Sequence, residues 1–269
     1  MDEPKTYPVT LISLNLPARH NEKLRQVQER IAGDVELQTL WRCANVNAVE
    51  RARITDHGPV HVRIVANIAL KLLRLLVEGG VAPSVVADHG LAVEDAEVVV
   101  VLATALHDVG IAVHRDGHES FSVSLADRMV RRFLEGLYPP TEATVVAAEI
   151  LHAVAAHRRD QRCLTVEAGV VKVADALDMT EGRSRIPFEA GDVNIHSVSA
   201  QAVDEVHLLK GEERPVRLEI VLNNSAGIFQ VDELLRGKVH GSSIAPYVEV
   251  VARIEGEAEK HIVTFYEAQ

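Results

Sequence analysis

The feature that most constrains this chain is an apolar helix pattern, residues 98–106, that ends in His107 and Asp108 side by side. Adjacent positions on an α-helix project about 100° apart, so both side chains can lie at the rim of one buried face. There they can offer a ring nitrogen and a carboxylate oxygen to one cation. A lone His-Asp pair is a weak indication, because such pairs also occur on solvated surfaces. The interpretation therefore depends on the neighbouring segments.

Composition and charge limit the class of protein. The 269 residues are 47% hydrophobic and 25% charged, which is typical of a soluble globular protein with one or two domains. The net charge of -11 argues against a nucleic-acid surface, since binding along a phosphate backbone needs a basic stripe. The sequence has neither an apolar run of ~18 residues nor a signal-peptide pattern, so we expect no membrane association. Cys43 and Cys163 are too few for a disulfide framework, which favours a cytoplasmic location.

Helix signals dominate the chain as far as about residue 182. An extended arm is expected over residues 1–20, and Asn21 is placed to cap the first helix. Gly58-Pro59 predicts a helix start that puts His61 in the first turn, in register with the apolar Val65. Further helices are expected to begin at His118, to end at His157, and to run from Val166 to Leu177 after a cap at Thr165.

The pattern changes near residue 189, where strand-like alternation begins. Strands are predicted at 193–199, 216–222, 248–254 and 261–266, with a helix at 228–239. We therefore expect a mainly α protein, with an all-helical domain over residues 21–188 and a small α+β domain over 189–269. The smaller domain is predicted to contain an antiparallel sheet, whose edges could mediate homo-oligomer formation.

Three motifs follow one another along the helices that are expected to face inward. They are Asp56-His57-Gly58 with the following His61, then His107-Asp108-Val109-Gly110, and then Val173-Ala174-Asp175. Together they resemble the HD superfamily of metal-dependent phosphohydrolases, over roughly residues 50 to 182. Each fragment is loose, but their order and spacing make the combination specific. The resemblance implies an HD-type helical bundle.

Relatives with a two-metal site carry two more histidines, at positions that His118 and His157 match. The resemblance thus implies six metal ligands, namely His61, His107, Asp108, His118, His157 and Asp175. Such a set suits one or two Mn, Fe, Co or Zn ions, with Asp108 as bridging ligand and central catalytic residue. The nearby His114 and His152 remain alternatives to His118 and His157. Asp178 is expected to be a helix-end carboxylate or to orient a ligand imidazole, and His57 to lie outside the ligand set.

The basic residues that would bind phosphate are less clearly marked. Many relatives follow the motif's glycine with a lysine, whereas this chain has Ile111. Arg183, Arg185 and Arg115 are the candidates for substrate binding, because a guanidinium group donates to phosphate oxygens in a planar fork. For each of them, the alternative is a surface charge that serves solubility.

The function predicted from the resemblance is hydrolysis of a phosphate ester or anhydride of a small molecule by a metal-activated hydroxide, with nucleotides as the implied substrate class. One alternative is a di-iron oxygenase of the same fold, which would require iron and consume dioxygen. Another is a non-catalytic nucleotide sensor, which would bind its ligand without turnover. Activity with redox-inert metals would exclude the oxygenase.

Overall fold

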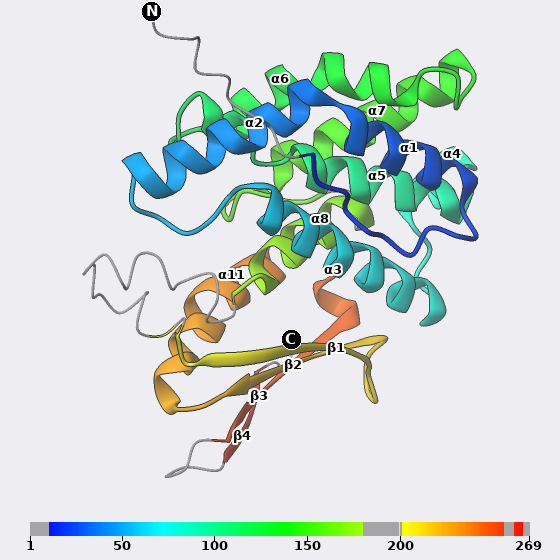
Figure 1. The fold of residues 1–269 in the computed structure, drawn as a ribbon. Coiled ribbons are helices and arrows are strands. Elements are labelled where there is room, and N and C mark those ends of the chain that lie inside the picture. The colour runs from blue at the N-terminus through cyan, green and yellow to red at the C-terminus, as the bar shows by residue number, and fades with distance from the viewer. Residues whose placement is uncertain (1–10, 180–198, 200, 256–260, 266–269) are drawn as a thin grey trace, which may run out of the picture.

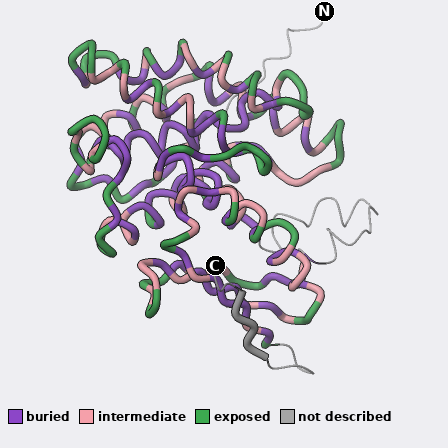
Figure 2. Tube along the Cα trace, turned by 180° about the vertical axis from the view of Figure 1, so that it is seen from behind, coloured by how far each residue is buried: buried purple, intermediate pink, exposed green. Residues whose placement is uncertain are grey.

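The computed structural model describes residues 11–179, 199, 201–255 and 261–265, and it places a layered helical region against a smaller sheet (Figure 1). Buried residues concentrate where the helices meet, and exposed residues line their outer faces (Figure 2). Within the described ranges, no helix is both long enough and apolar enough to cross a bilayer.

The helices of the larger region follow the predicted order, and the caps that the sequence predicts are present. Asn21 Oδ1 accepts a hydrogen bond from the N–H of Leu24, and Thr165 Oγ1 accepts one from Ala168. The α-helices are α1 (Glu22–Gly33), α2 (Val35–Asn45), α3 (Pro59–Glu78), α4 (Ser84–His89), α5 (Val93–Leu106), α6 (His118–Leu134), α7 (Pro140–Ala156) and α8 (Val166–Leu177). A π-helical turn over Val46–Arg51 extends α2, and a 3-10 turn over Val109–Ala112 follows α5.

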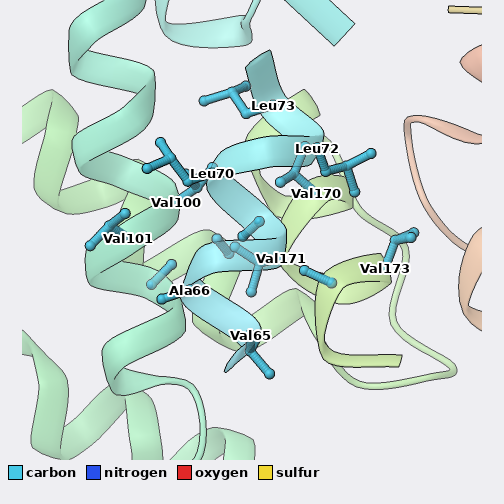
Figure 3. Close-up of a cluster of buried hydrophobic side chains, with 14 of the residues drawn as sticks. Val65, Ala66, Leu70, Leu72, Leu73, Val100, Val101, Val170, Val171 and Val173 are labelled. Atoms are coloured by element: carbon cyan, nitrogen blue, oxygen red, sulfur yellow. The ribbon is translucent and has the colours of Figure 1, made fainter. Parts of the chain in front are cut away.

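Helix α5 is the centre of the helical region. From Asp95 to Leu106 every residue is buried, as expected of a helix that is apolar on all sides. It contacts α3, α7, α8 and α1. Figure 3 shows side chains of α3, α5 and α8, among them Leu70, Val100 and Val171, gathered in one apolar cluster. This cluster fixes the three helices relative to one another, next to the ends that carry His61, His107 and Asp175.

The sheet has the order β1-β2-β3-β4 and corrects one expectation. Its strands are β1 (Val203–Lys210), β2 (Val216–Leu222), β3 (Val248–Ile254) and β4 (His261–Phe265). The outer pairs are antiparallel, but β2 and β3 are parallel, so the sheet is mixed and not antiparallel throughout. The physical reason is the connection between them: residues 223–247 form helical turns that carry the chain back to the starting end of the sheet. The predicted strand at 193–199 falls almost wholly outside the described residues.

The sheet and its crossover lie against helices α3 and α8. One face of β2, with Leu218 and Ile220, is buried, and the β1–β2 end of the sheet contacts α3. The crossover contains helix α11 (Arg236–His240), which packs against α8 beside the sheet (Figure 1). The C-terminal segment therefore reaches the region where α8 ends.

Gly110 provides a test of how tightly the turn after α5 is packed. A Cβ atom at this position would lie 2.1 Å from the carbonyl oxygen of His118 and 2.4 Å from the nitrogen of Ser122. We expect Gly110→Ala to lower the free energy of unfolding by about 1–3 kcal/mol or more, because the start of α6 would have to move. Urea denaturation measures the change.

The matched control is Gly33→Ala, also a glycine-to-alanine change at a helical end. No atom lies within 4 Å of a Cβ at Gly33, and its φ is not positive. We expect this variant to change the unfolding free energy by less than about 1 kcal/mol, in the stabilising direction. Equal stabilities for the two variants would show that the turn tolerates displacement.

Candidate metal centre

Polar side chains from five helices meet at one buried place. His61 lies in the first turn of α3, and His118 is the first residue of α6. His107 and His157 are the C-cap residues of α5 and α7. The carboxylates come from Asp108, next to His107, and from Asp175 in the last turn of α8. The structure therefore brings together the six side chains predicted from the sequence, and their residues are buried or nearly so.

Backbone carbonyl groups orient three of the four imidazoles. Nδ1 of His107 lies 2.8 Å from the carbonyl oxygen of Thr104, and Nδ1 of His157 lies 2.6 Å from that of Val154. Nδ1 of His118 lies 2.9 Å from the carbonyl oxygen of Arg115. In each case the acceptor is three residues earlier. For His107 and His157, donation from Nδ1–H to the carbonyl leaves Nε2 with a free lone pair, which is the form that binds a metal.

Asp178 orients the fourth imidazole. Its Oδ2 lies 2.6 Å from Nδ1 of His61, and both side chains are buried. A carboxylate behind a histidine fixes the ring and raises the basicity of the opposite nitrogen. Asp178 is the C-cap residue of α8, so the geometry matches both roles expected from the sequence, a helix-end carboxylate and a group that orients an imidazole.

The inward-facing atoms form two groups that share Asp108. In the first group, Asp108 Oδ2 lies 3.4 Å from His61 Nε2 and 3.2 Å from His107 Nε2, and Asp175 Oδ1 lies 3.4 Å from His61 Nε2. In the second, the other oxygen of Asp108, Oδ1, lies 3.2 Å from His118 Nε2 and 3.7 Å from His157 Nε2. Within each group the donor atoms lie within 4.8 Å of one another.

This donor set fits a divalent transition metal. The Nε2 atoms of His118 and His157 are 3.1 Å apart, and those of His61 and His107 are 3.4 Å apart. Lone pairs facing each other at these distances repel unless a cation, either a proton or a metal ion, lies between them. Neutral imidazoles combined with carboxylates suit Mn, Fe, Co or Zn better than Ca.

The electrostatics of the cluster favour anionic carboxylates and a protonated His107. Burial opposes ionisation of Asp108, but the neighbouring His107, His118 and His157 outweigh it and hold its pKa well below the usual value. Burial also opposes protonation of His107, yet Asp108 and Asp175 raise its pKa to about 10. The pKa of His157 is lowered, by burial first and then by the charge on His107. The two carboxylates therefore hold a proton at His107 in the absence of a metal.

A lysine that the sequence analysis did not identify also reaches the cluster. Lys238, on α11, forms an ion pair with Oδ2 of Asp175. With burial opposing it, Lys238 is the strongest of the charges that hold the pKa of Asp175 well below its usual value. No local signal marks this lysine, because 63 residues separate it from its partner and only the tertiary fold joins them.

The candidate phosphate-binding arginines and the two alternative histidine ligands lie at different places in the chain. The Arg115 guanidinium lies beside the cluster, with Nη1 2.8 Å from Nδ1 of His118. Arg183 and Arg185 lie outside the described residues. His114 is exposed and accepts a hydrogen bond from the N–H of Asp116, and His152 accepts one from Leu164. Neither of these two histidines belongs to the two donor groups.

His57 is close to the cluster but not part of it. Its ring centroid lies 5.5 Å from that of His61, and its Nδ1 lies 2.6 Å from the carbonyl oxygen of Thr55. The side chain therefore lies next to His61 and outside the two donor groups, as expected from its position before the helix.

Two comparisons with known proteins find similarity to this chain. The family model described as HD domain matches residues 60–180, which include all six side chains. An uncharacterized protein of Methanocaldococcus jannaschii, MJ1020, is 41% identical over 233 residues, which are 87% of this chain and 90% of the relative. The similarity to this relative thus extends beyond the helical region into the C-terminal sheet.

Metal binding at neutral pH should release a proton. The raised pKa of His107, about 10, means that this imidazole is protonated at pH 7 without metal and must lose the proton to become a ligand. We expect release of about one proton per molecule and an apparent affinity for Mn²⁺ that rises with pH towards 10. Calorimetric titrations with Mn²⁺ in buffers of different ionisation enthalpy measure the number of protons released. Binding without proton release would contradict the assignment.

Asp178 can be tested separately from the ligands. Asp178→Asn keeps the shape of the side chain but removes the negative charge behind His61. We expect the affinity for Mn²⁺ to fall by about 10- to 100-fold, the usual cost of losing an outer partner of a ligand. The control is Asp160→Asn, because Asp160 is exposed and pairs with Arg158. Equal affinities for the two variants would show that Asp178 has no orienting role.

Proposed function

This chain belongs to the HD-domain superfamily of metal-dependent phosphohydrolases, and from that premise we propose that it hydrolyses a phosphate ester or anhydride of a small molecule. Nucleotides are the substrate class that the family resemblance favours, and the cytoplasm is the expected location. The observation that carries the proposal is the sharing of Asp108 between two donor groups, one oxygen facing each.

In the proposed site, each residue has a defined part. His61, His107 and Asp175 would hold one divalent cation, His118 and His157 would hold a second, and Asp108 would bridge the two. Bound cations of this kind lower the pKa of a coordinated water towards ~7 and neutralise charge on phosphoryl oxygens. The side chains of His61 and His107 are 0% exposed, so the first group is shielded from bulk solvent.

Arg115 is the basic residue best placed to contact the substrate. It is exposed, and its guanidinium stands at the second donor group, beside His118. A guanidinium in this position can donate two hydrogen bonds to a phosphate group as the substrate approaches. Arg183 and Arg185 remain candidates for the same task.

The proposal is tested with metal-stripped protein that is reloaded with Mn²⁺, Co²⁺, Fe²⁺ or Zn²⁺ and supplied with a panel of nucleotides. We expect release of inorganic phosphate or pyrophosphate with at least one redox-inert metal, under anaerobic conditions as well as in air. Turnover that requires both iron and dioxygen would instead favour an oxygenase. Ligand binding without any turnover would favour a sensor.

The variant Asp108→Asn should lose both metal and turnover. Asp108 is expected to bind the metal directly. Its loss should therefore reduce kcat/KM by more than roughly 100-fold, which is the upper end of the loss seen when a residue that only orients a ligand is changed. The control is Asp127→Asn, because the side chain of Asp127 on α6 is 48% exposed and pairs with Arg131. If Asp108→Asn kept wild-type metal content and turnover, the proposed centre would be wrong.

A further inference from the structure

One face of helix α8 packs along residues 238–244 of the crossover. The contacts recur every three or four residues along α8, and the crossover runs in the opposite direction. The pairs are Thr165 with Ser243, Gly169 with Ser243 and Ile244, Lys172 with Gly241, and Asp175 with Lys238. The last of these pairs lies at the candidate metal centre.

Two of the pairs fix the register closely. A Cβ atom at Gly169 would lie 2.4 Å from Ser243 Oγ and 3.2 Å from the backbone nitrogen of Ile244, so a side chain at this position would displace the crossover. Lys172 is fully buried, and its Nζ donates hydrogen bonds to the carbonyl oxygens of Gln161 and Gly241. The position of Lys238 is therefore set by contacts along the helix as well as by its own ion pair.

The two oxygens of Asp175 face different partners. Oδ1 lies 3.4 Å from His61 Nε2 and 3.7 Å from His107 Nε2, on the side of the first donor group. Oδ2 is held by the ammonium group of Lys238. The side chains are 12% and 20% exposed, so the ion pair is largely removed from solvent.

We propose that Lys238 is a positioning residue that keeps Oδ2 of Asp175 away from the metal, so that Asp175 serves as a ligand through Oδ1 alone. The inference rests on the proposed function, because it takes Asp175 as a ligand. Through Lys238 the C-terminal segment becomes part of the metal centre, although its own strands supply none of the six donor side chains.

The reason for such a residue is the freedom of a carboxylate. An unrestrained aspartate can bind a cation with one oxygen or with both, and the second mode raises the coordination number. A higher coordination number takes a position that a catalytic site needs for water or substrate. An ammonium group on the outer oxygen removes the second mode and fixes the plane of the carboxylate.

The test uses the full-length protein loaded with Co²⁺, whose visible absorption weakens as the coordination number rises. The variant Lys238→Met removes the ammonium group and nearly preserves the size of the side chain. We expect a weaker absorption per bound Co²⁺ and a kcat lowered by about 10-fold or more, with a smaller change in KM. Lys238→Arg can still hold Oδ2, so it should restore both signals towards wild type.

The matched control is Lys210→Met, at an exposed lysine on β1 of the same segment. It should behave as wild type in every measurement. Cooperative unfolding and an unchanged far-UV circular dichroism spectrum of metal-free Lys238→Met would show that the fold is kept.

Two results would overturn the inference, and they differ in what they say about the function. If wild type binds Co²⁺ and hydrolyses its substrate, but Lys238→Met has the same spectrum and kcat, only the role of Lys238 is wrong. If wild type binds no metal, the proposed function and the role of Lys238 both fail. A loss of signal in Lys238→Met that Lys238→Arg does not restore would also contradict a positioning role.

Discussion

Hydrogen bonds from Nδ1 hold the imidazoles of the centre, and the rest of the site depends on them. The last carbonyl groups of a helix have no partner within the helix, and buried carbonyls without a partner are costly. His107 and His157 stand at the C-terminal ends of α5 and α7, where each can donate Nδ1–H to the carbonyl three residues earlier. The same bond that completes the helix end therefore turns Nε2 inward.

The apolar core determines where these helix ends meet. Helix α5 is buried on all sides, and the cluster that it forms with α3 and α8 leaves little freedom to slide or rotate. Gly110 then lets the start of α6 approach the turn after Asp108 closely, which brings His118 to the second oxygen of that carboxylate. Packing and ligand geometry are thus parts of one arrangement, so changes in the core should be felt at the centre.

Most helices and the six side chains of the candidate site could be predicted from the sequence, because the signals are either local or consist of the order of residues along the chain. Caps at Asn21 and Thr165 and the helix start at His118 follow from residue type and position, and the order of the polar residues indicated the family. The parallel pairing of β2 and β3 could not be predicted, since alternation marks a strand but not its direction. Lys238 was missed for a related reason, because its partner is distant in the sequence. The structure, by contrast, distinguishes His118 from His114 and His157 from His152, since only one of each pair faces Asp108.

The central claim is that Asp108 joins two cation sites whose other ligands come from different helices. Crystals of the protein grown with Mn²⁺ or Co²⁺ would test it directly, by anomalous scattering recorded at the absorption edge of the metal. We expect two peaks, one beside His61, His107 and Asp175 and one beside His118 and His157, with an oxygen of Asp108 next to each. Absence of a peak at these side chains, or a metal bound elsewhere in the fold, would contradict the claim.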